Sequence, residues 1–510
     1  MCLKKLEMPF VFPFLSNGKN HPLYGLSLLD NYKKLSDRSD ETLDSNGYPK
    51  KSYLPFWELI LSRGGLDKLI LAQKGACDRF RRLGVTFLLK NDKEKAKERI
   101  FPFDVIPRLI LKKEWEKIKI GLIQRLRALN LFIEDVYHDR RILKQGVVPE
   151  ELVSTSPGFI KQMAGVEVPA KVYAAVCGCD LIRDGDGDFV VLEDNLRIPS
   201  GASYMLVARK VLKESSPFFF SFHRPLSIQS YPLFLLETLL DLHPSGSKEE
   251  GAALWTPGPY NSAYFEHAFL ANQMGIPLVE SRDLFIEEGR LYFASRKRKK
   301  RISVLYRRIE ESFLDPSVFR ADSLIGLSSI FELFCKGELN LVNAPGCGVA
   351  DDKVLYRFVP EIIRYYLGEE PILRNVETYC CLDPKERSYV LENIERLVVK
   401  EANQSGGMGM LIGPLSSSRE REEFKEKIRA NPRNYIAQPL ISFSKLPCLV
   451  DKGIEARRVD LRPFVLLGKE PRVVPGGLTR VALDHNSFIV NSSQGGGSKD
   501  CWVIDDEDQR

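Results

Sequence analysis

One acid-rich stretch, DLIRDGDGDFVVLEDNLRIP at 180–199, constrains the local structure more than any other segment of the chain. In the middle of DLIRDGDGDFVVLED the only two-residue turn signal is Asp186-Gly187, a favoured pair for a tight type I′ hairpin. With those two residues as the loop, Asp180 faces Glu193 across an antiparallel strand pair. Asn195 returns to the same face because side chains alternate along a strand. The stretch therefore predicts a hairpin that gathers two carboxylates and one amide at its strand ends.

These three oxygen-bearing side chains suit a hard divalent cation, Mg²⁺ or Mn²⁺. An EF-hand loop starting at Asp184 is excluded, because it needs glycine and glutamate where this chain has Phe189 and Asn195. The alternative that stays open is an acidic hairpin tip that only faces solvent. It leaves the convergence of three ligand groups on one face unexplained.

A magnesium ion held by so few protein ligands usually completes its coordination with substrate phosphates, so a phosphate-binding element is expected elsewhere. The best candidate is Lys400 with the segment QSGGMG at 404–409, whose bare backbone N–H groups suit phosphate oxygens. The individual candidates are Lys400, Ser405, Gly406, Gly407 and Gly409. A Walker-type loop is excluded because no G-x-x-x-x-G-K-[S/T] motif occurs.

Four further residues are candidates for the same site. Lys353 ends GCGVADDK, where a helix is expected to begin, and the two aspartates before it are good N-caps. Capping and phosphate binding therefore both stay open for this stretch. Arg462 and Arg480 lie on consecutive predicted strands, and Asn491 lies on the next one. Surface ion pairs are the alternative for the two arginines.

The overall composition narrows the class of protein. The 510 residues suffice for two to four domains, and a net charge of +6 is too small to indicate nucleic-acid binding. No apolar run reaches the roughly 20 residues of a membrane span. Glu7 and two prolines interrupt the apolar N-terminal stretch, which argues against a signal peptide. The ten cysteines are scattered without zinc-site spacing, which favours reduced thiols and a cytoplasmic protein.

Hydrophobic periodicity separates three regions of the chain. The segment 114–139 predicts an amphipathic helix, with apolar residues at Trp115, Ile118, Leu122, Leu126, Leu129, Ile133 and Val136. From about 250, short strand-like runs alternate with helices, which predicts a small α/β unit with a mostly parallel sheet. A cluster of cations at 295–301 lies between two of these runs and is expected to be a solvated turn. The last third is rich in strands and glycine.

The late part of the chain resembles the nucleotide-binding half of ATP-grasp ligases, through LVVKEANQSGGMGM at 397–410 and the glutamine-bearing strand YIAQPLI at 435–441. The set of Asp180, Glu193 and Asn195 resembles the metal-binding strand pair of D-Ala-D-Ala ligases. In those enzymes the lysine and glycine loop come first, whereas here they come last. The chain is therefore identified as a member of the circularly permuted ATP-grasp proteins (type 2), often described as similar to glutathionylspermidine synthetase. The resemblance covers about 75–505, with one departure at Cys501, where threonine is expected.

The resemblance implies an α/β (α+β) protein with a circularly permuted ATP-grasp fold. It implies a mostly helical N-terminal region at 1–150, the metal-binding half at 151–215, a small Rossmann-like pre-ATP-grasp domain at 245–345, and the ATP-binding lid and palm at 346–510. The implied metal ligands are Asp180, Glu193 and Asn195. The implied phosphate and adenine contacts are Lys353, Lys400, Ser405, Gly406, Gly407, Gly409, Ala437 and Gln438. The implied contacts to the γ-phosphate and acyl substrate are Arg462, Arg480 and Asn491.

The function implied is an ATP-dependent carboxylate-amine ligase that uses ATP with Mg²⁺ or Mn²⁺ and forms an acyl phosphate before the amide. Its partners would be a small-molecule or peptide carboxylate and an amine, with neither membrane nor nucleic acid expected. The alternative is a catalytically idle nucleotide-binding protein with a regulatory or scaffold role.

Overall fold

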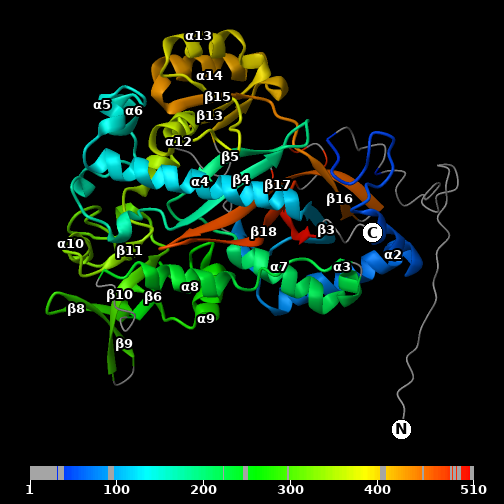
Figure 1. Cartoon of the computed structure of the whole chain (residues 1–510), viewed down its shortest axis with the longest axis horizontal. Coiled ribbons are helices and arrows are strands. Elements are labelled where there is room, and N and C mark those ends of the chain that lie inside the picture. The colour runs from blue at the N-terminus through cyan, green and yellow to red at the C-terminus, as the bar shows by residue number, and fades with distance from the viewer. Residues whose placement is uncertain are drawn as a thin grey trace.

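A seven-stranded sheet at the centre of the computed structural model joins segments from the early, middle and late parts of the chain (Figure 1). Its strands lie in the order β3-β19-β18-β17-β4-β5, and β16 pairs with β17. All neighbours are antiparallel except β19 and β3, which are parallel. The bounds are β3 Phe103–Leu111, β4 Val176–Arg183, β5 Phe189–Asn195, β16 Lys445–Val450, β17 Gly453–Leu467, β18 Pro471–Val481 and β19 Gly497–Ile504.

The structure describes residues 32, 39–89, 97–221, 223–244, 251–295, 298–402, 409–450, 453–482, 485, 487, 490 and 496–505. Within these ranges no helix is both long and apolar enough to cross a membrane. The predicted site residues Ser405, Gly406, Gly407 and Asn491 lie outside the described residues.

Helices cover both faces of the central sheet (Figure 1). The long helix α4 (Lys112–Tyr137) crosses one face, and α3 (Gly65–Arg82), α7 (Ala202–Ser215) and α8 (Tyr231–Asp241) pack on the other. The predicted amphipathic helix is confirmed, because its apolar stripe is buried at Trp115, Ile118, Leu122, Leu126, Leu129, Ile133 and Val136. The outer side of α4 packs against α12 (Val359–Leu367). The early helices are α2 (Leu54–Ser62) and α3, and β1 (Thr86–Leu89) pairs with β2 (Lys97–Ile100).

The turn between β4 and β5 differs from the predicted two-residue loop. The backbone N–H of Asp184 donates to the carbonyl of Asp188 at 2.9 Å, so the loop holds the three residues 185–187. The Asp184 carboxylate explains the extra residue, because it accepts the backbone N–H groups of Asp186 and Asp188 at 3.1 and 3.0 Å. Gly187 closes the loop with φ of +89°, a conformation that favours glycine.

The predicted facing pair nevertheless forms. Asp180 lies opposite Glu193, while one residue further along β4, Leu181 lies opposite Val191. Leu192 is therefore an extra residue on β5, and this bulge shifts the register by one. The shift cancels the additional residue in the turn. The two carboxylates consequently face each other as predicted. The predicted two-residue loop was wrong, because a three-residue loop and a bulge together give the same register.

A separate six-stranded sheet forms from the segment after residue 250, in the order β7-β6-β10-β9-β8 with β11 beside β10 (Figure 1). The pairs among β6, β7, β10 and β11 are parallel, whereas β8, β9 and β10 pair antiparallel. Helices α9 (Tyr264–Met274) and α10 (Ile330–Cys335) belong to the same segment. The strand bounds are β6 Gly251–Trp255, β7 Leu278–Val279, β8 Leu284–Glu287, β9 Arg290–Ser295, β10 Arg298–Arg307 and β11 Asn340–Val342.

The basic run expected to be a solvated turn is mostly strand. Residues 298–301 form the first part of β10 and pair with β9, and 296–297 lie outside the described residues. Lys299 and Lys300 are exposed. The prediction of solvent exposure is therefore confirmed for these two lysines, and the prediction of a turn was wrong for 298–301.

A four-stranded antiparallel sheet carries the predicted nucleotide-binding strands, and it stands above the central sheet in Figure 1. Its order is β12-β15-β13-β14, covered by α13 (Pro384–Glu392) and α14 (Ser418–Ala430). Both helices begin at capping residues: Asp383 accepts two backbone N–H groups, and Ser417 forms a capping box with Glu420. The strands are β12 Tyr379–Cys380, β13 Leu397–Glu401, β14 Met410–Ile412 and β15 Tyr435–Pro439.

Candidate functional site

A pocket lies between the end of β5, the start of α11 (Lys353–Tyr356) and the strands β13 and β15. Four of the predicted site residues line it, namely Glu193, Lys353, Lys400 and Gln438. Positions 193 and 400 belong to different sheets and lie far apart in sequence, yet they face the same pocket. Glu193 of the predicted acidic strand pair and the late Lys400 therefore share one cleft, whereas Asp180 is not among the residues that line this pocket.

Lys400 is the central cation of this pocket. Its ammonium group donates to the side-chain oxygen of Gln438 at 2.6 Å, and the amide nitrogen of Gln438 donates to Thr378 at 2.8 Å. Burial lowers the pKa of Lys400 to about 8, and the nearby ammonium of Lys353 acts in the same direction, while Glu193 opposes both. An anionic group bound here would relieve that unfavourable burial of charge.

Lys353 provides a second cation on the opposite wall. Its ammonium group lies 3.3 Å from Glu193 Oε1. The capping role that the sequence left open belongs to the preceding Asp352, which accepts the backbone N–H of Val354 at 2.9 Å. Arg433 and Ser156 also donate to the Asp352 carboxylate. Capping by Asp352 is therefore confirmed, and phosphate binding by Lys353, which lines the pocket, stays a prediction.

Asp351 fixes the pocket wall to the end of β5. One of its carboxylate oxygens accepts the backbone N–H of Leu196 at 2.6 Å, and the other accepts from Arg197 Nε at 2.9 Å. Burial raises the pKa of Asp351, although the Arg197 guanidinium opposes the rise. The segment that carries Lys353 is therefore attached directly to the strand that carries Glu193.

Asp180 is engaged by both predicted arginines. Arg462 Nε and Nη2 donate to its two carboxylate oxygens at 2.5 and 2.8 Å, and Arg480 Nη2 donates at 2.7 Å. Arg480 also pairs with the buried Asp460. Burial alone would raise the pKa of Asp180, but the two guanidinium groups outweigh it and lower the pKa to about 2. The alternative of surface ion pairs was therefore wrong for Arg480, which is buried.

The donor set fits a divalent cation at two of the three predicted positions. Glu193 faces the pocket with a carboxylate, and Asn195 carries a buried side-chain amide nitrogen with no hydrogen-bond partner in the described part of the chain. Rotating this amide by half a turn would present its oxygen in the same place, since the two atoms are similar in shape. Asp180 is anionic, but it would have to share its oxygens between an ion and Arg462 and Arg480.

Two other predicted residues have defined places. Gly409 has φ of +66°, and a Cβ there would come within 2.8 Å of the Glu401 side chain, so glycine suits the position. Ala437 is fully buried on β15, and its side chain packs in the core of the four-stranded sheet with Val399 and Leu411. Only its backbone is therefore available to a nucleotide.

Sequence reasoning missed two polar partners near the site. Thr378 fixes the Gln438 amide, and no motif marks it. Arg125 of α4 forms two 2.7 Å hydrogen bonds with the buried Asp194, the residue between Glu193 and Asn195. Strand alternation places Asp194 on the other face of β5. Its partner comes from a distant helix and has no local sequence signal.

Comparison with known proteins identifies the relatives of this architecture. A family model described as circularly permuted ATP-grasp type 2 matches residues 107–482. An uncharacterized protein of Synechocystis sp. is 49% identical over 468 residues, which are 91% of this chain and 96% of that protein. An uncharacterized protein of Mycobacterium tuberculosis is 42% identical over 467 residues, which are 91% of this chain and 84% of that protein.

Two further similarities bear on the fold and on chemistry. A protein of Frankia alni named "Putative glutamate--cysteine ligase 2-3" is 38% identical over 91% of this chain, but the match spans 53% of that protein. The structure of a glutathione synthetase-like effector from Globodera pallida in apo form has a TM-score of 0.53 and 11% identity, covering 86% of this chain and 97% of that one. At this identity the structural likeness concerns the fold alone. The family match over most of the chain, joined with relatives of high coverage, shows that the chain belongs to the circularly permuted ATP-grasp type 2 family.

Proposed function

We propose that this protein is an ATP-dependent carboxylate-amine ligase that works through an acyl phosphate. The observation that carries the proposal is the shared pocket, where Glu193 of β5 faces Lys400 and Gln438 of the four-stranded sheet. Membership in an ATP-grasp family implies ATP binding. The name of the Frankia alni relative supports ligase chemistry, but only about half of that protein aligns with this chain, so the name by itself assigns no substrate here.

The proposed roles follow from charge and position. Lys400 and Lys353 bind the phosphates, together with the segment 404–409, and Gln438 and the backbone of Ala437 face the adenine. Glu193 and Asn195 hold Mg²⁺ or Mn²⁺, with Asp180 as a shared third ligand. The cation would offset negative charge on the phosphates during transfer.

The reaction has two steps. A carboxylate oxygen of the first substrate attacks the γ-phosphorus of ATP, and the bond to the bridging oxygen breaks, which releases ADP and leaves an acyl phosphate. An amine nitrogen then attacks the acyl carbon, phosphate departs, and the nitrogen loses a proton to give the amide. Lys353 and Lys400 stabilise the phosphate charge in the first step. Arg462 and Arg480, held in place by Asp180, are proposed to orient the anionic acyl group. The same role is proposed for Asn491 from the family resemblance alone.

The test measures ADP release from ATP and Mg²⁺ in the presence of pooled amino acids and polyamines, including glutamate and cysteine. We expect the wild type to release ADP over many turnovers only when both a carboxylate and an amine are supplied, because the amine must discharge the acyl phosphate, and Glu193→Gln to lose most of that release. The matched control is Glu310→Gln, which changes a carboxylate that is mostly exposed and pairs with Arg197. Equal, trace ADP release from wild type and Glu193→Gln would overturn the ligase proposal, and ATP binding without turnover would favour the idle nucleotide-binding alternative.

A further inference from the structure

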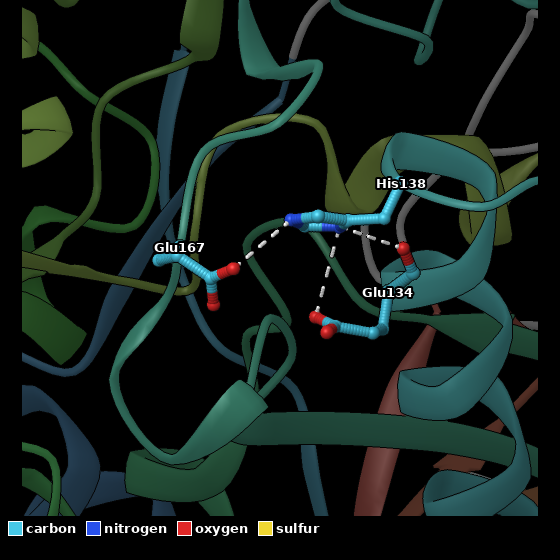
Figure 2. Close-up of side chains that lie close together, drawn as sticks. All are labelled: Glu134, His138 and Glu167. Carbon is cyan, nitrogen blue, oxygen red and sulfur yellow. Dashed lines mark hydrogen bonds and ion pairs between the residues drawn. The ribbon is translucent and has the colours of Figure 1, made fainter.

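Three ligand-type side chains converge at the C-terminal end of α4, away from the pocket (Figure 2). Glu134 and His138 lie one helical turn apart, and Glu167 approaches from the segment that follows the short helix η1 (Lys161–Met163). One potential ligand atom of each residue lies within 4.8 Å of the other two. None of these residues has a part in the proposed ligase chemistry.

The hydrogen bonding of His138 defines which ring nitrogen is available. Its Nδ1 lies 3.0 Å from the backbone carbonyl of Glu134, which can only accept, so Nδ1 carries the proton. A neutral imidazole therefore presents a lone pair at Nε2. Nε2 is buried, has no hydrogen-bond partner among the described residues, and lies 3.7 Å from Glu167 Oε1. A lone pair facing a carboxylate is repulsive unless a cation lies between them.

The Glu134 carboxylate lies against the same imidazole, with its Oε2 4.0 Å from Nδ1. Its Oε1 accepts from Lys171 at 2.8 Å, whereas its Oε2 is buried and accepts no well-formed hydrogen bond from the described residues, although the Tyr173 hydroxyl lies close to this carboxylate. Buried polar atoms without partners are uncommon and point to a missing ligand. Two such atoms here, one imidazole nitrogen and one carboxylate oxygen, belong to the same three-residue cluster.

We propose that Glu134, His138 and Glu167 bind one divalent first-row transition-metal ion, of which Zn²⁺ is the representative. Two atoms 3.7 Å apart can both lie at the ~2.1 Å distance of a zinc ligand from one ion. The Glu167 side chain is 76% exposed, so it is free to adjust toward the ion. An imidazole with carboxylates favours such metals over Mg²⁺, which prefers oxygen ligands throughout.

The ion would join the end of α4 to the segment around Glu167. The adjacent Tyr137 donates to the carbonyl of Gly346 at 2.9 Å and accepts the N–H of Ile160 at 3.0 Å. Gly346 precedes the short helix that ends at Asp351 and leads into α11, which begins at Lys353. Metal binding would therefore stabilise the scaffold behind one wall of the pocket without entering it.

The test titrates Zn²⁺ into the full-length, chelator-treated protein by isothermal titration calorimetry, with Mg²⁺ in excess. We expect one Zn²⁺ site in the wild type. The affinity should fall by at least about tenfold in His138→Ala and in Glu167→Gln, because loss of a residue that only hydrogen-bonds to a metal ligand already costs about that much. Glu167→Gln changes an exposed side chain, so its fold should be intact, which circular dichroism checks.

Two controls isolate the site. His485→Ala removes an imidazole from an exposed position, and Glu193→Gln removes a carboxylate from the pocket, and both should bind Zn²⁺ like the wild type. The proposal is overturned if the wild type shows no site that depends on His138, as expected if the imidazole merely holds a proton between the carboxylates. It is also overturned if both cluster variants bind as the wild type does. Neither result depends on ligase activity.

Discussion

At the scale of single residues, the charge of Lys400 couples the pocket to pH. Burial holds its pKa at about 8, so the free protein loses this charge as the pH rises through that value. Bound phosphate would favour the protonated form, and ATP binding would then require uptake of a proton at high pH. The affinity of the pocket for ATP should therefore depend on pH in a range where ATP itself is fully ionised.

We expect the affinity for ATP with Mg²⁺ to fall between pH 7 and pH 9, by a factor that approaches about tenfold per pH unit above pH 8. Lys400→Arg should lack this dependence, because a guanidinium stays protonated throughout the range. Calorimetric titrations at pH 7, 8 and 9 measure both slopes. Identical slopes in the two proteins would show that another group titrates.

The ion pairs around Arg480 predict a large effect on stability. Arg480→Met leaves Asp180 and Asp460 buried without their shared cation, and we expect the free energy of unfolding to fall by about 3–5 kcal/mol. Adding Asp460→Asn should restore part of it by removing the carboxylate that has lost its ion-pair partner, while Asp180 keeps Arg462. Urea denaturation monitored by fluorescence measures the change.

The matched control is Arg320→Met, which breaks an exposed arginine-aspartate pair with Asp322. Its cost should stay below about 1 kcal/mol. A similar cost for the two arginine variants would mean that burial does not set the strength of the Asp180 network.

Sequence patterns predict which residues face each other within one hairpin better than they predict contacts with residues on other strands. Asp180 and Glu193 follow from local spacing within one hairpin. Arg462 and Arg480 reach Asp180 through the pairing of β17 with β4 and with β18, and that register depends on contacts between distant parts of the chain. Their places on consecutive predicted strands and the resemblance to a family made these arginines candidates for the site, but neither indicated that they pair with a metal-ligand candidate.

At the scale of secondary-structure elements, a close backbone contact supports the pocket wall. A Cβ added at Gly158 would lie 2.2 Å from the backbone of Gly348, in the short helix η6 (Cys347–Asp351). Gly158→Ala should therefore displace this turn, lower the free energy of unfolding by about 1–3 kcal/mol, and weaken ATP binding. Thermal unfolding and calorimetry measure the two effects.

Gly185→Ala is the control for the same chemical change. Nothing lies within 4 Å of a Cβ at Gly185, in the hairpin loop, so both stability and ATP affinity should stay near the wild-type values. Equal behaviour of the two alanine variants would contradict the role assigned to the contact between Gly158 and η6.

The β4–β5 hairpin shows why the predicted turn was wrong while the predicted facing of Asp180 and Glu193 was confirmed. Turn type depended on the Asp184 carboxylate, which accepts two backbone N–H groups and stabilises a three-residue loop. Register depended instead on burial of the apolar residues of β4 and β5, and a bulge at Leu192 accommodated the longer loop. The amphipathic pattern of α4 was sufficient for the helix because its stripe repeats along the whole segment.

At the scale of the whole molecule, the proposed nucleotide site spans segments that are far apart in sequence. A non-hydrolysable ATP analogue with Mg²⁺ should slow amide hydrogen exchange in β5, α11, β13 and β15 together, because all four line the pocket. The strands β8 and β9 belong to the separate six-stranded sheet and should be unaffected. Mass spectrometry of peptic peptides measures these changes, and protection confined to one of the four segments would contradict a shared site.

The pairing of β3 with β19 has a consequence for how the protein is made. In the central sheet β3 lies beside β19, so its strand partner is translated only after residues 112–496, which separate the two strands. Until then, β3, which is rich in isoleucine and leucine and is almost entirely buried in the folded protein, has no strand partner in the nascent polypeptide. Synthesis of this protein should therefore rely on chaperones that shield β3 until the last strand arrives.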